Sequence, residues 1–159
     1  MDILLVEDER TLAIPLADAL GERGHSVKVF HDGAAALAWM NEHRCELVVT
    51  DVRLPGADGI SILQRARSQD PPCEVLVMTG YASVDQAVEA MRGGAVSYLQ
   101  KPFPMEALLG QVERVEETRN MQNELRRLRK QAGDDSTQLT GTSTAVHEIN
   151  KRIRKVASE

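Results

Sequence analysis

Acidic, hydroxyl and ammonium side chains follow four of the apolar segments of this sequence. Glu7 and Asp8 come directly after the first segment, Asp51 closes the third, Thr79 closes the fourth, and Lys101 follows the fifth. Parallel strands of one sheet have their carboxyl ends at a common edge. If these segments are such strands, three carboxylates, a hydroxyl and an ammonium group converge in one crevice.

Three carboxylates in a small space predict a bound cation. Crowded carboxylates repel one another, and their pKa values rise unless a positive charge compensates. Mg²⁺ prefers oxygen ligands, is held by one or two carboxylates and keeps waters that a phosphate can replace. A neighbouring lysine adds a second positive charge, and this combination suits phosphoryl transfer, which depends on positioning and charge neutralisation. The pattern therefore predicts Asp51 as phosphoryl acceptor, Lys101 as charge partner and Thr79 as hydrogen-bond donor to a phosphoryl oxygen.

Each of these residues also has an ordinary alternative. A carboxylate at a strand end often caps a helix, so Asp8 or Glu9 could simply open the first helix. Thr79 could be a loop hydroxyl and Lys101 a surface charge. The functional interpretation is favoured because the residues occur together, at four strand ends in the right order.

Short apolar runs alternate with helical patterns along the first part of the chain. Strands are predicted near residues 2–6, 26–30, 46–50, 74–78 and 95–99. Helices are predicted near residues 9–23, 33–42, 58–69 and 83–92, with a further one beginning near Met105. The strands are continuously apolar, as expected when both faces of a parallel sheet are covered. The predicted fold is therefore α/β, a doubly wound five-stranded parallel sheet.

A long helical pattern follows the predicted sheet. One apolar stripe comprises Leu108, Val112 and Val115, and a second comprises Met121, Leu125, Leu128 and Ala132. The second stripe is one residue out of the heptad frame of the first. A narrow stripe on a long helix is typical of pairing with a partner helix. The alternative is a single solvated helix that frays after about residue 120. A break or linker is predicted at residues 133–136, followed by one more amphipathic helix.

Composition and charge exclude several classes of protein. Nine basic and five acidic residues from Arg119 onward leave the first 118 residues with a net charge of −9, unlike the basic folded face of a DNA-binding domain. The longest apolar runs are far shorter than a membrane span, and no signal peptide is visible. Cys45 and Cys73 show no metal-binding spacing, which argues against a zinc site and a disulfide scaffold and fits a cytoplasmic protein.

Residues 1–120 resemble the receiver domains of two-component response regulators, whose fold is flavodoxin-like. The matching stretches are LLVEDE (4–9), VVTDVRLPGADG (48–59), VLVMTGYAS (75–83) and AVEAMRGGAVSYLQKPF (87–103). The resemblance implies that Glu7, Asp8 and Asp51 bind Mg²⁺ together with the backbone carbonyl of Arg53. It also implies phosphorylation of Asp51 by a sensor histidine kinase.

Further roles follow from the same resemblance. Thr79 and Lys101 contact the phosphoryl group, and Tyr98 matches the aromatic residue that turns inward when Thr79 moves. The peptide bond between Lys101 and Pro102 is expected to be cis. Arg53 and Tyr81 fall two residues after Asp51 and Thr79, so we expect these bulky side chains to slow dephosphorylation.

The last segment carries a second resemblance. LTGTSTAVHEINKRIRKVASE (139–159) is similar to the opening of the AAA+ ATPase domain of sigma-54-dependent transcriptional activators. The phosphate-binding loop of such a domain is absent from this chain, so the chain itself is not expected to hydrolyse ATP. An ordinary amphipathic linker helix is the alternative. The predicted organisation is a receiver domain over 1–120, a linker or coiled-coil helix and loop over 121–138, and a truncated ATPase domain over 139–159.

The sequence thus predicts a phosphorylation-dependent switch rather than an enzyme. The expected partners are a histidine kinase, downstream ATPase and DNA-binding domains, and a second copy of the chain. The two copies are expected to pair through the linker helix, with the face formed by the helix at 83–92, the strand at 95–99 and the helix from Met105 as another candidate contact. Neither a membrane nor direct nucleic-acid contact is expected.

Other classes of protein use some of the same residue types. A haloacid-dehalogenase-type phosphatase needs a second Asp two residues after its nucleophile, and Arg53 stands there. A flavodoxin-like cofactor carrier needs a Ser-, Thr- or Gly-rich loop after the first strand, where this chain has Glu7-Asp8-Glu9. A receiver that acts mainly as a dimerisation module, with Asp51 little used, stays open.

Overall fold

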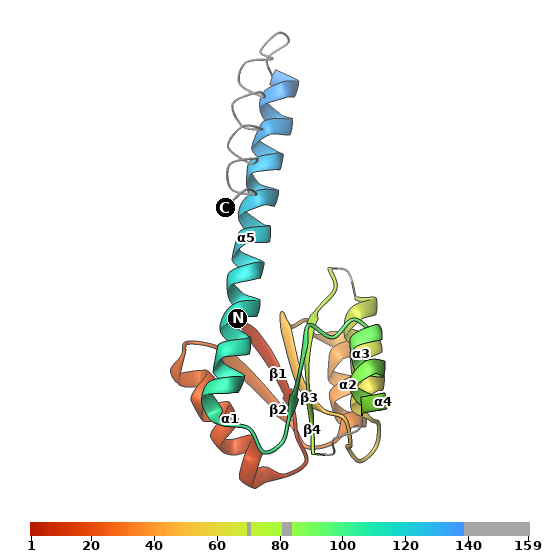
Figure 1. The fold of residues 1–159 in the computed structure, drawn as a ribbon. Helices are drawn as coiled ribbons and strands as arrows, with labels where there is room; N and C mark the ends of the chain where they lie inside the picture. The colour runs from red at the N-terminus through yellow and green to blue at the C-terminus, as the bar shows by residue number, and fades with distance from the viewer. Residues whose placement is uncertain (70, 81–83, 139–159) are drawn as a thin grey trace. The chain divides into compact units, whose positions relative to one another are not determined.

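Helices cover both faces of a parallel sheet in the computed structural model, which describes residues 1–69, 71–80 and 84–138 (Figure 1). The strands are β1 (Asp2–Val6), β2 (Ser26–Phe30), β3 (Leu47–Asp51), β4 (Glu74–Thr79) and β5 (Ser97–Gln100). Their order in the sheet is β2-β1-β3-β4-β5, and all four pairings are parallel. The predicted doubly wound α/β fold is confirmed.

The helices divide between the two faces of the sheet. They are α1 (Arg10–Glu22), α2 (Gly33–Glu42), α3 (Gly59–Ser68), α4 (Val84–Arg92) and α5 (Met105–Gln138). Helix α1 and the first part of α5 lie on one face, and α2, α3 and α4 lie on the other (Figure 1). The sheet is therefore enclosed between two helical layers, which explains why its central strands contain few polar residues.

Alternate residues of each central strand enter opposite halves of the core. In β1, Leu4 and Val6 pack with α2, α3 and α4, whereas Ile3 and Leu5 pack with α1 and α5. This follows from the period of two residues in a strand. Continuous apolar runs were thus the correct signal for a doubly covered sheet.

Two glycines allow the backbone to pack closely beside the carboxyl ends of the strands. A Cβ atom on Gly33, at the start of α2, would lie 1.9 Å from the carbonyl oxygen of Ala57, and one on Gly59, at the start of α3, would lie 2.1 Å from that of Asp51. Asp32 caps α2 by accepting a hydrogen bond from the Ala35 amide at 2.9 Å. These contacts fix the loop that follows Asp51 against the start of α2.

Two expected boundaries differ from the observed ones. Strand β5 begins at Ser97 rather than near residue 95, because Gly94 has a positive φ of 100° and the Ala95 amide still bonds to Ala90 of α4. The predicted break at 133–136 was wrong, since α5 continues to Gln138. A single glycine costs a helix only about 1 kcal/mol, which neighbouring turns can offset.

Three ring side chains pack together beside β2, the strand at one edge of the sheet. The rings of Trp39 and His43 stack with centroids 4.7 Å apart, and Phe30 lies 6.1 Å from Trp39. The His43 imidazole also bonds through Nδ1 to the Trp39 carbonyl oxygen at 3.1 Å. The three rings therefore cover the carboxyl end of α2.

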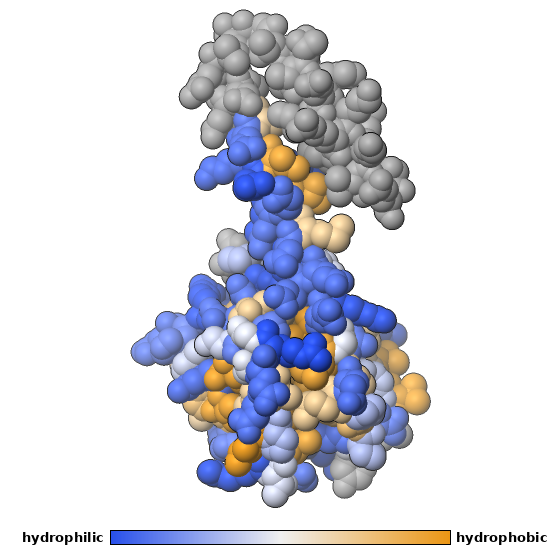
Figure 2. Space-filling model, turned by 90° about the vertical axis from the view of Figure 1, so that its left-hand side faces the viewer, coloured by the Kyte–Doolittle hydropathy of each residue, from blue (hydrophilic) through white to orange (hydrophobic). Residues whose placement is uncertain are grey.

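The chain divides into two units, Met1–Val115 and Glu116–Glu159. The sheet, its helical layers and the start of α5 make up the first unit. In the second unit, the described part of α5 is hydrophilic with apolar residues along one side (Figure 2). In the part of the chain that the structure describes, no helix combines the length and the apolar character needed to cross a membrane.

Candidate functional site

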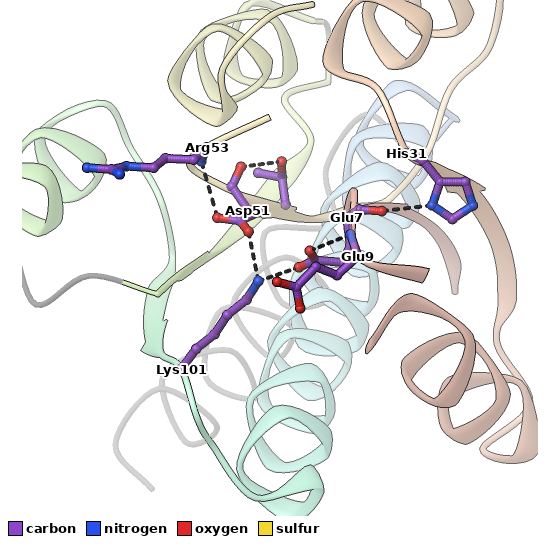
Figure 3. A network of polar contacts seen from close by, with 7 residues as sticks. Glu7, Glu9, His31, Asp51, Arg53 and Lys101 are labelled. Carbon is purple, nitrogen blue, oxygen red and sulfur yellow. Dashed lines mark hydrogen bonds and ion pairs between the residues drawn. The ribbon is translucent and has the colours of Figure 1, made fainter. Parts of the chain in front are cut away.

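The sheet brings the predicted residues together at the carboxyl ends of its strands. Glu7 and Asp8 follow β1, Asp51 and Thr79 are the last residues of β3 and β4, and Lys101 follows β5. Figure 3 shows the side chain of Lys101, which follows β5, reaching toward both Glu7 and Asp51. The predicted convergence of strand ends is therefore present in the fold.

The Lys101 ammonium group bridges two buried carboxylates. Its Nζ atom donates to Glu7 Oε2 at 2.6 Å and to Asp51 Oδ2 at 2.7 Å. The side chain of Glu7 is fully buried, and that of Asp51 is 11% exposed. Charge-assisted hydrogen bonds of this length are strong, and they hold two like charges close to each other.

Asp8 completes a cluster of three carboxylates. One oxygen from each of Glu7, Asp8 and Asp51 lies within 4.8 Å of the other two, and Asp8 is the exposed member. Hard oxygen donors in this number suit Mg²⁺, which would still keep water ligands on its open side. The donor set therefore fits the predicted metal.

Burial raises the pKa of Glu7 above its ordinary value of 4.5. Hydrogen bonds from Lys101 and the Glu9 amide act in the opposite direction, because they stabilise the ionised carboxylate. The Asp51 charge adds to the increase. A cation near Glu7 would favour the ionised form and so oppose the effect of burial.

The pKa of Lys101 is also raised, but for a lysine this shift favours the charged form. Burial disfavours its charge, but hydrogen bonds to Asp51 and Glu7 outweigh burial and raise its pKa above 10.5. The group is therefore an ammonium ion at neutral pH. It supplies a fixed positive charge beside Asp51.

Backbone groups orient the two buried carboxylates. The Glu9 amide donates to Glu7 Oε1 at 3.1 Å, and the Arg53 amide donates to Asp51 Oδ1 at 3.2 Å. The Arg53 side chain points away from Asp51 (Figure 3). Ligation of a metal by the Arg53 carbonyl stays a prediction.

The contact of His31 with Glu7 was not predicted from the sequence. Its Nδ1 atom lies 2.8 Å from the Glu7 carbonyl oxygen, so Nδ1 carries the proton and donates (Figure 3). His31 follows β2, the strand next to β1, and this adjacency in the sheet is the signal that could have suggested the contact.

The two predicted switch residues lie on adjacent strands, with Thr79 at the end of β4 and Tyr98 within β5, opposite Val77. Thr79 is buried, and its carbonyl oxygen accepts from the Lys101 amide at 2.7 Å. Tyr98 is half-buried and, with residues of α4, lines an apolar groove of about 620 Å³. The peptide bond between Lys101 and Pro102 is cis, as expected. Tyr81 lies outside the described residues, so its predicted effect on dephosphorylation stays a prediction.

A second groove opens beside Lys101. Its volume is about 480 Å³, and its walls include Glu9 and Leu12 on one side and Gly80 and Phe103 on the other. Lys101 is part of this lining, and its ammonium group contacts Glu7 and Asp51.

A family model described as "Response regulator receiver domain" matches residues 3–113. The response regulator protein FleR of Pseudomonas aeruginosa is 46% identical over 112 residues, a match that covers 70% of this chain and 24% of that protein. The regulatory protein AtoC of Escherichia coli is 35% identical over 158 residues, covering 98% of this chain and 34% of AtoC. The chain thus spans a quarter to a third of these curated relatives.

A solved structure agrees with these matches. The crystal structure of a Burkholderia pseudomallei response regulator with a phosphorylated aspartic acid, a calcium ion and citrate aligns with a TM-score of 0.63 at 27% identity. The alignment covers 85% of each chain.

Proposed function

The chain belongs to the response regulator receiver domain family, and on this premise we propose that Asp51 accepts a phosphoryl group in a Mg²⁺-dependent reaction. The observation that carries the proposal is the bridge from Lys101 to Glu7 and Asp51 at 2.6 and 2.7 Å. It places Asp51, a member of the acidic cluster, in direct contact with a fixed cation. Phosphoryl transfer needs this arrangement because negative charge accumulates on the transferred oxygens.

The proposed transfer moves a phosphoryl group from a phosphohistidine of a sensor kinase to Asp51. An Asp51 carboxylate oxygen forms the new bond to phosphorus, while the bond from phosphorus to the histidine nitrogen breaks. Glu7, Asp8, Asp51 and the Arg53 carbonyl would hold Mg²⁺, which neutralises charge on the phosphoryl oxygens. Lys101 then binds a phosphoryl oxygen, and the Thr79 hydroxyl donates to another.

The groove lined by Tyr98 supports a role for this residue as a switch. A half-buried ring beside open apolar space has room to occupy a second position. Engagement of Thr79 by the phosphoryl group would favour one of two pre-existing arrangements of Tyr98 and α4. The phosphoryl group would thereby change the surface formed by α4, β5 and α5.

Receiver domains pair with histidine kinases, and we propose that a cytoplasmic sensor kinase is the donor for this chain. The groove lined by Lys101, the contact residue of Asp51, supports this proposal. We further propose that residues 1–120 form the receiver, that 121–138 form a dimeric linker, and that 139–159 begin an AAA+ domain of a sigma-54-dependent activator. The AtoC match across 98% of the chain supports continuation beyond the receiver.

Intact-mass measurement after incubation with acetyl phosphate and Mg²⁺ tests the central proposal. We expect the mass of one phosphoryl group to be gained by the chain. The gain should be lost with EDTA and in the Asp51→Asn variant, which keeps the size of the side chain. An unmodified mass, together with no binding of beryllofluoride, would contradict the proposal and favour a receiver that serves as a dimerisation module.

A further inference from the structure

Two cysteine thiols lie together at the amino-terminal edge of the sheet. The Sγ atoms of Cys45 and Cys73 are 3.5 Å apart, and neither cysteine is in a disulfide. The residues are 28 positions apart in the sequence, and the fold alone brings them together. We propose that this pair is a reversible modification site, at which a hydroperoxide converts the two thiols to an intramolecular disulfide.

The surrounding backbone holds the pair in place. Cys45 and Cys73 precede the neighbouring strands β3 and β4, and the Glu74 amide donates to the Glu46 carbonyl oxygen at 3.2 Å. The Cys73 amide donates to the Ala66 carbonyl oxygen of α3 at 3.0 Å. A disulfide needs an S–S distance of about 2.05 Å. The remaining approach can come from side-chain rotation while these backbone hydrogen bonds stay formed.

Arg67 adds a second constraint on Cys73. Its Nη1 atom donates to the Cys73 carbonyl oxygen at 3.4 Å and lies 3.6 Å from Glu74 Oε1. The guanidinium group thus ties the end of α3 to the start of β4. These contacts hold the backbone of Cys73 in place beside Cys45.

The two thiols differ in access, which assigns them different steps. Cys45 is half-buried, whereas Cys73 is 1% exposed. The Cys45 thiolate attacks the outer peroxide oxygen, the O–O bond breaks, and a sulfenic acid forms with release of water or an alcohol. Cys73 Sγ then attacks Cys45 Sγ and expels the hydroxyl group as water. Two thiols are oxidised and one peroxide is reduced overall.

The site lies at the opposite end of β3 from the phosphoryl acceptor. Asp51 lies six positions after Cys45, a span of about 20 Å in an extended chain at 3.3 Å per residue. The thiols therefore do not contact the acidic cluster. Oxidation would add a covalent link between β3 and β4, the strands that end in Asp51 and Thr79.

Mass spectrometry of the full chain tests the proposal with hydrogen peroxide as the probe. After oxidation, the chain is unfolded and treated with N-ethylmaleimide. We expect a product that has lost two hydrogen atoms and takes up no label, with Cys45 linked to Cys73 in peptide maps. Dithiothreitol should restore two labelled thiols. Formation of the disulfide in guanidinium chloride should be at least about tenfold slower, because the unfolded chain must first bring Cys45 and Cys73 together.

Two variants separate the steps. In Cys73→Ala, oxidation should stop at a Cys45 sulfenic acid that dimedone traps. In Cys45→Ser, Cys73 should react at least about tenfold more slowly than Cys45 does in Cys73→Ala, because it is buried. A wild-type chain that keeps both thiols, cross-links only between chains, or proceeds to sulfinic acid without a disulfide would overturn the proposal. These wild-type outcomes decide the question even if a variant fails to fold.

Discussion

Lys101 contacts the same carboxylates that would bind a metal ion. Its Nζ atom donates to one oxygen of Glu7 and one of Asp51, both within 2.7 Å. The ammonium group therefore competes with a cation for these oxygens while supplying charge to the phosphoryl group. Its two effects on the site should be separable by mutation.

The Lys101→Ala variant should bind Mg²⁺ more tightly, because the competing ammonium group is gone. Its phosphorylation by acetyl phosphate should nevertheless fall by about 100-fold, since a charge partner of the phosphoryl oxygens is missing. Calorimetry and intact mass measure the two effects. Lys28→Ala, on the exposed edge strand β2, is the matched control and should change neither. Weaker Mg²⁺ binding in Lys101→Ala would contradict this account.

The raised pKa of Glu7 makes folding stability depend on pH in the absence of metal. Below the ordinary value of 4.5 the group is protonated in both the folded and the unfolded chain. As the pH rises through the raised folded value, the buried carboxyl group must ionise, and its contribution to stability is lost. Wild type should therefore lose free energy of unfolding relative to Glu7→Gln as the pH rises above 4.5.

Urea unfolding with EDTA at several pH values between about 4 and 8 measures this difference. Mg²⁺ should restore the stability of wild type at the upper end of the range, because it binds the ionised carboxylate in the folded state. Glu22→Gln, at an exposed carboxyl group, controls for the loss of a surface charge. A difference between wild type and Glu7→Gln that stays constant with pH would refute the link to Glu7 ionisation.

The convergence of Glu7, Asp51 and Lys101 was predictable, because these residue types are unusual at strand ends and parallel strands bring such ends to one edge of the sheet. The contacts of His31 and of the Glu9 amide with Glu7 were missed, since neither residue type nor spacing shows which groups lie against this residue in the fold. The pairing of Cys45 and Cys73 was missed for the same reason. Their contact depends on the register of β3 against β4.

At the scale of elements, the site depends on helices that begin directly beside the strand ends. Gly33 opens α2 against the loop that follows Asp51, and Gly59 opens α3 against Asp51 itself. A side chain at either position would meet backbone atoms, which cannot move aside as a flexible side chain can. Gly110, within α5, has no comparable neighbour within 4 Å.

These glycines should respond oppositely to alanine. Gly110→Ala should raise the free energy of unfolding by about 0.5–1 kcal/mol, because it removes backbone freedom in a helix where space is open. Gly33→Ala should lower it by about 1–3 kcal/mol, since the loop around Ala57 must shift. Denaturant unfolding of the two variants compares them directly. Equal effects of the same sign would show that the close approach does not constrain the fold.

Element types were predictable from period and length, but element ends were less so. Continuous apolar runs identified β1, β3 and β4 because both of their faces are buried. The start of β5 was misplaced because a positive φ at Gly94 extends the turn. The helix end was misplaced because Gly133 and its acidic neighbours favour a break only weakly, and α5 continues through them.

At the scale of the whole molecule, the second unit carries an apolar stripe on a hydrophilic helix. Met121 in this stripe is 57% exposed. The stripe also contains Leu125, Leu128 and Ala132. Burial of such residues is a common driving force for helix pairing, and a second copy of the chain provides an identical stripe.

Sedimentation equilibrium should find the full chain as a dimer and the double variant Leu125→Lys/Leu128→Lys as a monomer. The matched control Gln122→Lys/Asn123→Lys adds the same charge beside the stripe and should stay dimeric. If the leucine variant keeps the dimer mass, pairing occurs through another surface. The face formed by α4, β5 and α5 would then be tested with Val88→Lys, since Val88 is 41% exposed.

The stack of Trp39 on His43 gives the chain an intrinsic fluorescent probe. Trp39 is the single tryptophan in the sequence, so all indole emission comes from the carboxyl end of α2 beside the sheet edge. An imidazole in face-to-face contact quenches or shifts that emission according to how closely the rings lie. Because this fluorophore belongs to neither the acidic cluster nor the groove beside Tyr98, any spectral change on adding Mg²⁺ or acetyl phosphate would be a signal carried to it through α2 and the sheet. No dye would have to be attached to record it.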